Sequence, residues 1–334
     1  MARWAAGGSE AHVAQAARDA VARGNAVDAV VTGVLVAAAE APGVLLGPVQ
    51  LLVGGAGAGL QAVDGRVRQP GLGIPRPRGV VSGGTVPPTA RIGVPTLPAA
   101  LASAVASLGA TTLLRAAGPG IERARTVSPE RAAVLQAIAR RGAAAMTDDG
   151  VAVELVVAAG RAAGGTLTRD DLEAARPVVV PCDERSLAPS GVLRVPWRGE
   201  EGAARSGATT HVVVAADGRG LVAIACYEVP GEGVAIPALG LLAPALASPV
   251  MRGEARVRPG EARPACAPIA LRMRRGIVDV AIGLAEAPDG EASLEALLAH
   301  LDDAARLLEA VGSAPGRPVA LVRTGDTAAI VASR

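Results

Sequence analysis

The chain has 334 residues, half of them apolar, and a net charge of only +2. Aromatic residues make up 1% of it, and the basic residues are interspersed with acidic ones, which argues against nucleic-acid binding because bases stack on aromatic rings and phosphates need clustered cations. The three Cys and three His residues form no CxxC or HExxH spacing, so no metal site is predicted. There is also no P-loop and no GxGxxG after a predicted strand, so no cofactor is predicted.

No segment of the sequence is typical of a membrane or secretory element. The most apolar region, residues 26–60, is interrupted by acidic and Pro residues, which leaves no continuous span of ~20 apolar residues. The amino-terminal segment lacks the unbroken apolar stretch of a signal peptide. The sequence therefore predicts a cytoplasmic protein without a membrane partner, and a homo-oligomer is compatible with it.

The first half of the chain predicts helices separated by one hairpin. Ser9 is a candidate N-cap for a helix over 10–24, and a second helix over 26–41 should end at Pro42. Residues 48–66 predict two strands about a Gly-rich turn. After a Pro- and Gly-rich stretch over 68–95, helical patterns follow in the segments 96–109, 128–142, 149–165 and 167–175. Thr168 is a candidate N-cap for the last of these, with Asp171 three residues later as its capping-box partner.

The second half predicts mainly strands. A strand over 177–185 and a polar connection over 184–208 precede two hairpins, 209–229 and 267–283. A long amphipathic helix over about 290–311 and two closing strands over 317–333 complete the chain. Helices, antiparallel hairpins and helices again predict an α+β fold in layers.

Six short segments, in this order, resemble the γ-glutamyltransferase family of N-terminal-nucleophile hydrolases. "RGNAVDAVV" (23–31), "VDGRVRQP" (63–70) and "GGTLTRDDLEAARPVV" (164–179) are similar to the family's "GGNAVDAAVA", "DGRETAP" and "GGLLTLEDLAAYRPVV". "TTHVVVAADGRGLVAI" (209–224) is similar to "TTHLSVVDADGNAVSL". Two further segments, 92–109 and 263–270, also match family patterns.

The resemblance implies a four-layer αββα sandwich with antiparallel central sheets, formed by one domain over 1–334. Residues 1–208 would correspond to the large subunit and 209–334 to the small one, after scission between Ala208 and Thr209. Thr209 would then be the nucleophile, with its freed α-amino group as base and Thr210 in support. Arg66 would hold the substrate α-carboxylate through bidentate hydrogen bonds. For His211, a hydrogen-bonded structural role is favoured over that of a general base.

The chain departs from the family around this nucleophile. Tyr227 and Val229 stand where a hydroxyl and an amide are expected, and "LLAPALASP" (241–249) has no carboxylate for a substrate ammonium group. "GLAEAPDGEA" (283–292) has only isolated glycines in place of the Gly pair that supplies oxyanion donors, and the loss of one such donor typically costs ~10²–10³ in turnover.

Three functions remain open on the sequence alone. The first is a γ-glutamyl amide hydrolase or transferase acting on glutathione-like substrates, with impaired or lost activity. The second is an inactive relative with a binding or assembly role. The third is an amidohydrolase or acyltransferase for a more apolar amide. An active protein would take a small-molecule amide or peptide as substrate.

Overall fold

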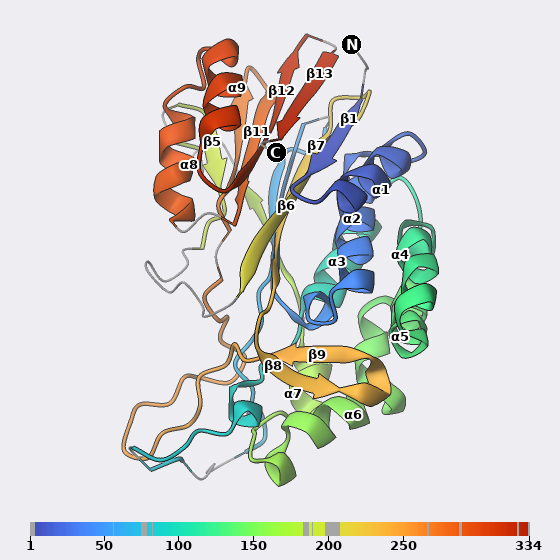
Figure 1. Ribbon diagram of the computed structural model, residues 1–334, viewed down its shortest axis with the longest axis vertical. Helices are drawn as coiled ribbons and strands as arrows, with labels where there is room; N and C mark the ends of the chain where they lie inside the picture. Colours follow the sequence, from blue (N-terminus) through green and yellow to red (C-terminus); the bar gives the residue numbers. More distant parts are fainter. Residues whose placement is uncertain are drawn as a thin grey trace.

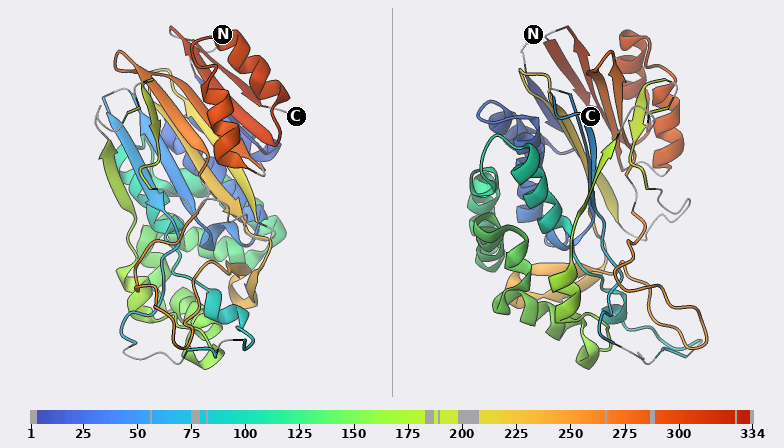
Figure 2. Two further views of the ribbon diagram at one scale, coloured as in Figure 1. Left: turned by 90° about the vertical axis from the view of Figure 1, so that its left-hand side faces the viewer. Right: turned by 180° about the vertical axis from the view of Figure 1, so that it is seen from behind.

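Two antiparallel sheets lie face to face at the centre of the computed structural model, and helices cover the outer face of each (Figures 1 and 2). The structure describes residues 4–55, 57–74, 79–81, 83–182, 187–188, 190–197, 208–265, 267–286, 289–325 and 327–332. The layers therefore follow the order helices, sheet, sheet, helices.

The first sheet combines strands from both halves of the chain. Its order is β1 (Ala5–Gly8), β6 (Thr209–Ala216), β7 (Val222–Val229), β2 (Val49–Gly54), β3 (Leu60–Gly65) and β4 (Val178–Cys182). The second sheet has the order β13 (Thr327–Ala332), β12 (Arg317–Thr324), β11 (Ile277–Ala285), β10 (Ile269–Arg274) and β5 (Val192–Arg194). A separate hairpin pairs β8 (Gly233–Ile236) with β9 (Leu241–Pro244). Because β6 lies between β1 and β7, residues on both sides of position 208 share one hydrogen-bonded sheet.

The helices form two unequal layers. The larger layer, on the first sheet and below it in Figure 1, contains α1 (Ala11–Val21), α2 (Ala26–Glu40), α3 (Leu97–Leu108), α4 (Leu113–Val127), α5 (Pro129–Arg141), α6 (Asp149–Ala159) and α7 (Arg169–Ala174). The smaller layer contains α8 (Gly290–Leu298) and α9 (Ala304–Ser313), which lie against the second sheet. Short 3-10 turns occupy Val44–Leu46, Pro88–Arg91, Gly142–Thr147, Arg161–Ala163 and Pro237–Leu239.

Strand alternation divides the apolar interior into three cores. On β6, Val213 and Ala215 face the helices, whereas Val212 and Val214 face the second sheet. A third core lies between the second sheet and its two helices. The helix α2 lies very close to β6, since a Cβ added to Gly33 would be 3.0 Å from the Val213 side chain. With almost no aromatic residues, the cores are filled by Val, Leu, Ala and Ile.

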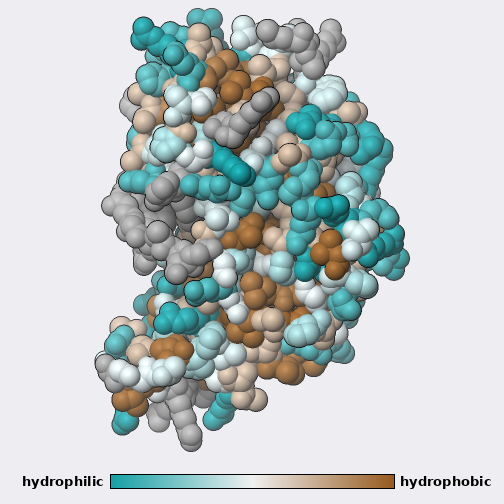
Figure 3. Space-filling model, viewed as in Figure 1, coloured by the Kyte–Doolittle hydropathy of each residue, from teal (hydrophilic) through white to brown (hydrophobic). Residues whose placement is uncertain are grey.

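The outer surface carries no single apolar face in the view of Figure 3, where apolar side chains form separate patches among polar ones. The longest described helices, α2 and α4, have 15 residues each, and spanning a bilayer takes ~20. Within the described ranges, therefore, no helix has both the length and the hydrophobicity to cross a membrane.

The structure confirms the three predicted hairpins and the capping box formed by Thr168 and Asp171. It corrects the predicted long helix over 290–311, which is two helices because Asp303 accepts hydrogen bonds from the first amide groups of α9. It also corrects the cap of the first helix. Glu10 is the N-cap residue of α1, and the Ser9 hydroxyl instead binds the β6 backbone at Val212. The strands β1, β5, β8 and β9 and the helix α4 were not predicted.

Candidate active site

Thr209 is the first residue of β6 and is exposed, while Ala208 before it is half-buried. Because side chains alternate along a strand, Thr209 lies on the same face as His211 and Val213, toward the helices. The Thr209 Oγ1 atom is 3.0 Å from Nε2 of His211. The predicted nucleophile thus has a hydrogen-bonding imidazole two residues away on its own strand.

His211 is 6% exposed and is held on several sides. Its Nδ1 atom lies 3.4 Å from Ser9 Oγ and 3.6 Å from Glu10 Oε2. Its ring stacks on Tyr227, with centroids 5.6 Å apart and planes 20° apart. The Tyr227 hydroxyl donates a 2.6 Å hydrogen bond to the same Glu10 oxygen. Glu10, His211 and Thr209 therefore form a connected array that ends at an exposed hydroxyl.

The pairing of β1 with β6 brings Glu10 to this position. The register places Gly8 beside Val213, so the residues after Gly8 run past the start of β6 toward His211. A Cβ at Gly8 would lie 2.9 Å from the Val212 carbonyl oxygen, so the close approach of the two strands requires glycine there. The Ser9 hydroxyl accepts a 3.1 Å hydrogen bond from the Val212 amide and fixes the turn into α1.

Burial controls the protonation of the two rings. It lowers the pKa of His211 below its ordinary 6.5, and the negative charges of Glu10 and Glu286 only partly oppose this. Burial, followed by the charge of Glu10, raises the pKa of Tyr227 well above 10.0. At neutral pH the imidazole is therefore uncharged and able to accept a proton, and the phenol remains a donor.

Thr210 points to the opposite face of β6, toward the second sheet, because it alternates with Thr209. Its carbonyl oxygen accepts a 3.0 Å hydrogen bond from the Glu286 amide at the end of β11. Glu286 has a φ of 53°, a left-handed conformation that is uncommon outside glycine. The Thr210 backbone thus links the two sheets beside the candidate nucleophile.

Arg66 lies just after β3, at the end of the first sheet where β6 begins, but its guanidinium is already occupied. Its Nε and Nη2 atoms each donate a 2.9 Å hydrogen bond to the two oxygens of Asp64. The guanidinium also lies over the Trp197 ring, 5.2 Å from its centroid. The guanidinium edge that would bind a substrate carboxylate therefore binds the carboxylate of Asp64.

Arg66 and Thr209 are not brought together by this arrangement. Asp64, the partner of Arg66, lies on the face toward the second sheet, as do its strand neighbours Ala62 and Leu60. Thr209 points to the other face. Three strand spacings separate β3 from β6, about 14 Å at the usual strand separation. The binding role of Arg66 and the nucleophilic role of Thr209 stay predictions.

The region beyond the end of β7 is apolar. Strand β8 begins four residues after β7 ends, and β8 and β9 form the hairpin seen below the first sheet in Figure 1. Leu241, Ala243 and Ala247 are buried there, in the segment that lacks carboxylates. Leu241 and Ala243 belong to the core between the first sheet and its helices, so this segment has buried apolar side chains where the family pattern has acids and amides.

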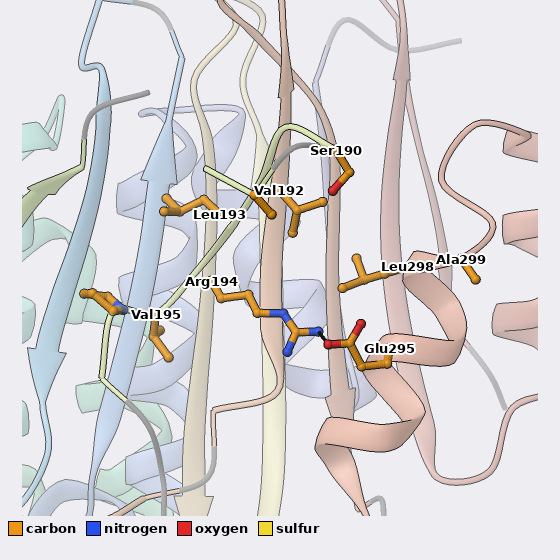
Figure 4. Close-up of a pocket in the computed structure, with 10 residues that line it drawn as sticks. Ser190, Val192, Leu193, Arg194, Val195, Glu295, Leu298 and Ala299 are labelled. Atoms are coloured by element: carbon orange, nitrogen blue, oxygen red, sulfur yellow. Dashed lines mark ion pairs between the residues drawn. The ribbon is translucent and has the colours of Figure 1, made fainter. Parts of the chain in front are cut away.

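A separate hollow of about 600 Å³ lies between β5 and α8 (Figure 4). Arg194 extends from β5 across it to Glu295, at 2.8 Å, and also contacts Glu291 at 3.1 Å. None of the residues that line it is a predicted site residue. In the part of the chain that the structure describes, no group of three His, Cys, Asp or Glu side chains could hold a metal ion.

The sequence did not predict that three residues would join Thr209 and His211 in this array: Ser9, Glu10 and Tyr227. A Thr-x-His pair on one strand was a usable signal, because residues two apart on a strand share a face. The contribution of Glu10 depends on the unpredicted strand β1. Tyr227 stands where the family pattern has a hydroxyl, and its own hydroxyl reaches the array through Glu10.

No protein-family model matches the sequence, and no curated protein matches it. Solved structures do. LmbA2991T421A aligns over 99% of this chain and 96% of its own, with a TM-score of 0.73 and 13% identity. Cephalosporin acylase from Bacillus halodurans aligns over 99% and 93%, with a TM-score of 0.69 and 14% identity. A γ-glutamyltranspeptidase from Helicobacter pylori aligns over 51% and 63%, with a TM-score of 0.43 and 19% identity.

The first two similarities extend over nearly the whole of each chain. Together with the two sheets between helical layers, they confirm the predicted fold. The chain has a four-layer αββα sandwich with antiparallel central sheets, a fold similar to that of the cephalosporin acylase. At these identities the similarity establishes the fold, and the chemistry has to be argued from the site itself.

Proposed function

We propose that this protein is an amide hydrolase or acyl transferase whose nucleophile is Thr209. The observation that carries the proposal is the 3.0 Å contact between the exposed Thr209 hydroxyl and the buried, uncharged imidazole of His211. A hydroxyl that is accessible to substrate and hydrogen-bonded to a base is the arrangement that nucleophilic acyl transfer requires. The start of a central strand also holds this hydroxyl rigidly.

The acyl group that fits best has no γ-glutamyl head. Asp64 occupies the guanidinium edge of Arg66, and the segment 241–249 offers buried apolar side chains without a carboxylate. The resemblance assigns the segment 241–249 to the head group of the substrate, and a charged amino-acid head would be desolvated there without a partner, which costs several kcal/mol. We therefore propose a small amide or peptide with an apolar acyl group, in preference to a glutathione-like substrate.

Scission between Ala208 and Thr209 belongs to the same proposal. The two products, residues 1–208 and 209–334, would stay together because β6 is hydrogen-bonded to β1 and β7 is hydrogen-bonded to β2. Purified protein is incubated and its mass is measured under denaturing conditions. Two fragments should replace the 33.0 kDa chain, and Thr209→Ala should remain intact. Cutting that continues in Thr209→Ala would remove Thr209 from the scission step.

Activity is tested with two p-nitroanilides, butyryl and γ-glutamyl, assayed side by side. The proposal expects release of p-nitroaniline from the butyryl compound, a smaller rate with the γ-glutamyl compound, and loss of both in Thr209→Ala. A faster γ-glutamyl reaction would favour the glutathione-like alternative.

A binding or assembly role without catalysis is the second candidate, favoured by the internal pairing of Arg66 with Asp64. It predicts that neither anilide is hydrolysed and that Thr209 is never acylated.

A further inference from the structure

The two nitrogens of His211 have chemically different partners. Nδ1 faces the carboxylate of Glu10, which can only accept, and the hydroxyl of Ser9, which lies 3.4 Å from the Val212 carbonyl as a donor. Both neighbours of Nδ1 can therefore accept a hydrogen bond from an Nδ1–H group. This places the ring proton on Nδ1 and leaves the lone pair of Nε2 facing the Thr209 hydroxyl, 3.0 Å away.

We infer that His211 is the catalytic base for Thr209, that Glu10 is its positioning residue, and that this pair activates the hydroxyl while Thr209 is still joined to Ala208. The inference rests on the proposed function and adds a side-chain base to it. The α-amino group that the resemblance implies as base would then not be needed for acyl transfer. A chain that is never cut could be an active enzyme.

The proton transfers balance without any added reagent. Nε2 takes the Thr209 proton as Oγ1 forms a bond to the acyl carbon, and the imidazolium gives that proton to the leaving amine as the C–N bond breaks. Water then attacks the acyl-threonine ester, with its proton passing to Nε2. The ester C–O bond breaks, Oγ1 recovers its proton from the imidazolium, and the acid is released.

Glu10 and Tyr227 fix the base in a single orientation. Tyr227 donates a 2.6 Å hydrogen bond to Glu10 and stacks on the imidazole, so a turn of the ring would break its stacking on Tyr227 and its contact with Glu10. The charge of Glu10 stabilises the imidazolium that forms during the reaction. The titratable and charged groups that act on His211 come from several elements: Glu10, His12, Tyr227, Glu286 and Arg317.

The identity of the base sets the pH at which the nucleophile works. A base is active when unprotonated, so the rate should rise with pH through the pKa of that base. The pKa of His211 lies below 6.5, whereas an unperturbed α-amino group titrates at about 7.7–8.0. With His211 as base the rate is already maximal at neutral pH and falls only in acid.

The test uses the full chain and p-nitrophenyl acetate as the probe. Release of p-nitrophenolate gives the acylation rate over about pH 4.5–9, and mass spectrometry locates the acetyl group and shows whether its carrier is cut. In an assay made before scission is complete, we expect acetyl on Thr209 of the uncut chain, with a rate that rises through a pKa below 6.5. His211→Gln should lower this rate by about 10²–10⁴-fold.

Two further variants separate chemistry from folding. In Glu10→Gln the acid limb of the pH profile should move to lower pH, because the charge that raises the His211 pKa is lost. A purely structural Glu10 would not move it. His300→Gln, a histidine outside the array, should match wild type, and thermal melting shows that each variant is folded.

Two results would overturn the inference or its basis. If only the fragment that begins at Thr209 is acetylated, with a pKa near 8 and no effect of His211→Gln, the inference is wrong and the proposed function stands. If Thr209 is not acetylated in either form at any pH, the proposed function fails as well.

Discussion

Two buried polar clusters lie at the same end of the first sheet, on opposite faces. The Arg66 cluster is closed: Asp64 is paired by Arg66 and Arg68, and all three side chains are nearly buried. The Thr209 cluster is open, because Glu10 and His211 lead to a hydroxyl that is exposed to solvent. In a closed cluster all polar groups pair with one another and stabilise the fold. In an open cluster one polar group, here the Thr209 hydroxyl, is accessible for chemistry.

This difference bears on the family resemblance. The sequence pattern around Arg66 is similar to a substrate-binding segment, yet the guanidinium serves an internal carboxylate. Thr209, by contrast, is an exposed residue at the start of β6, and its predicted role as a nucleophile stays a prediction. A variant that removes one part of either cluster shows whether that part contributes to stability or to chemistry.

The largest effect on stability is expected for Asp64→Ala. Asp64 is 3% exposed and its two Arg partners are 11% and 12% exposed, so the variant leaves two nearly buried cations unpaired. Breaking a buried ion pair in this way costs about 3–5 kcal/mol of unfolding free energy, measured by urea denaturation. Asp149→Ala is the matched control, because its pair with Arg169 is exposed and should contribute little.

A loss from Asp64→Ala as small as that of Asp149→Ala would contradict the closed-cluster interpretation. It would mean that Arg66 does not depend on its internal partner and is free to bind a ligand. In that case Arg66→Ala should weaken binding of a γ-glutamyl substrate without changing stability.

An intermediate effect is expected for Tyr227→Phe. The hydroxyl is buried and bonded to the charged Glu10, so its loss should cost about 1.5–3 kcal/mol of unfolding free energy. The lower end is expected, since Glu10 is 23% exposed and water can replace the donor.

The pH dependence of Tyr227→Phe supplies an internal control. Folding raises the pKa of Tyr227 above 10.0, so the wild type should lose stability as pH rises past that value, because the unfolded chain ionises first. The Phe variant should lack this loss. Parallel pH profiles of wild type and variant would show that folding does not raise the pKa of Tyr227, which would contradict the burial of its hydroxyl beside Glu10.

The sequence predicted the parts of this molecule that depend on local pattern. The hairpin 209–229 follows from alternation about a Gly turn, and the Thr168–Asp171 capping box from four consecutive residues. The role of Thr209 as a nucleophile was predicted from the resemblance alone. Glu10 could not be predicted, because it reaches His211 only through the pairing of β1 with a strand 200 positions later. Asp64 and Arg66 are only two residues apart, so their ion pair was predictable from the sequence. The resemblance instead assigned Arg66 to the carboxylate of a substrate.

The smallest effect on stability, and a complete effect on chemistry, is expected for Thr209→Val. The side chain is exposed, valine keeps the branched shape that strands favour, and a net hydrogen bond is worth about 0.5–1.5 kcal/mol. The unfolding free energy should therefore change by less than about 1 kcal/mol, while acetylation by p-nitrophenyl acetate disappears. Thr210→Val is the matched control, because it changes the neighbouring hydroxyl on the opposite face and should leave acetylation in place. A loss of about 3 kcal/mol in Thr209→Val would instead make the Thr209–His211 contact a structural one, comparable to the Asp64 pair, and the second cluster would be closed as well.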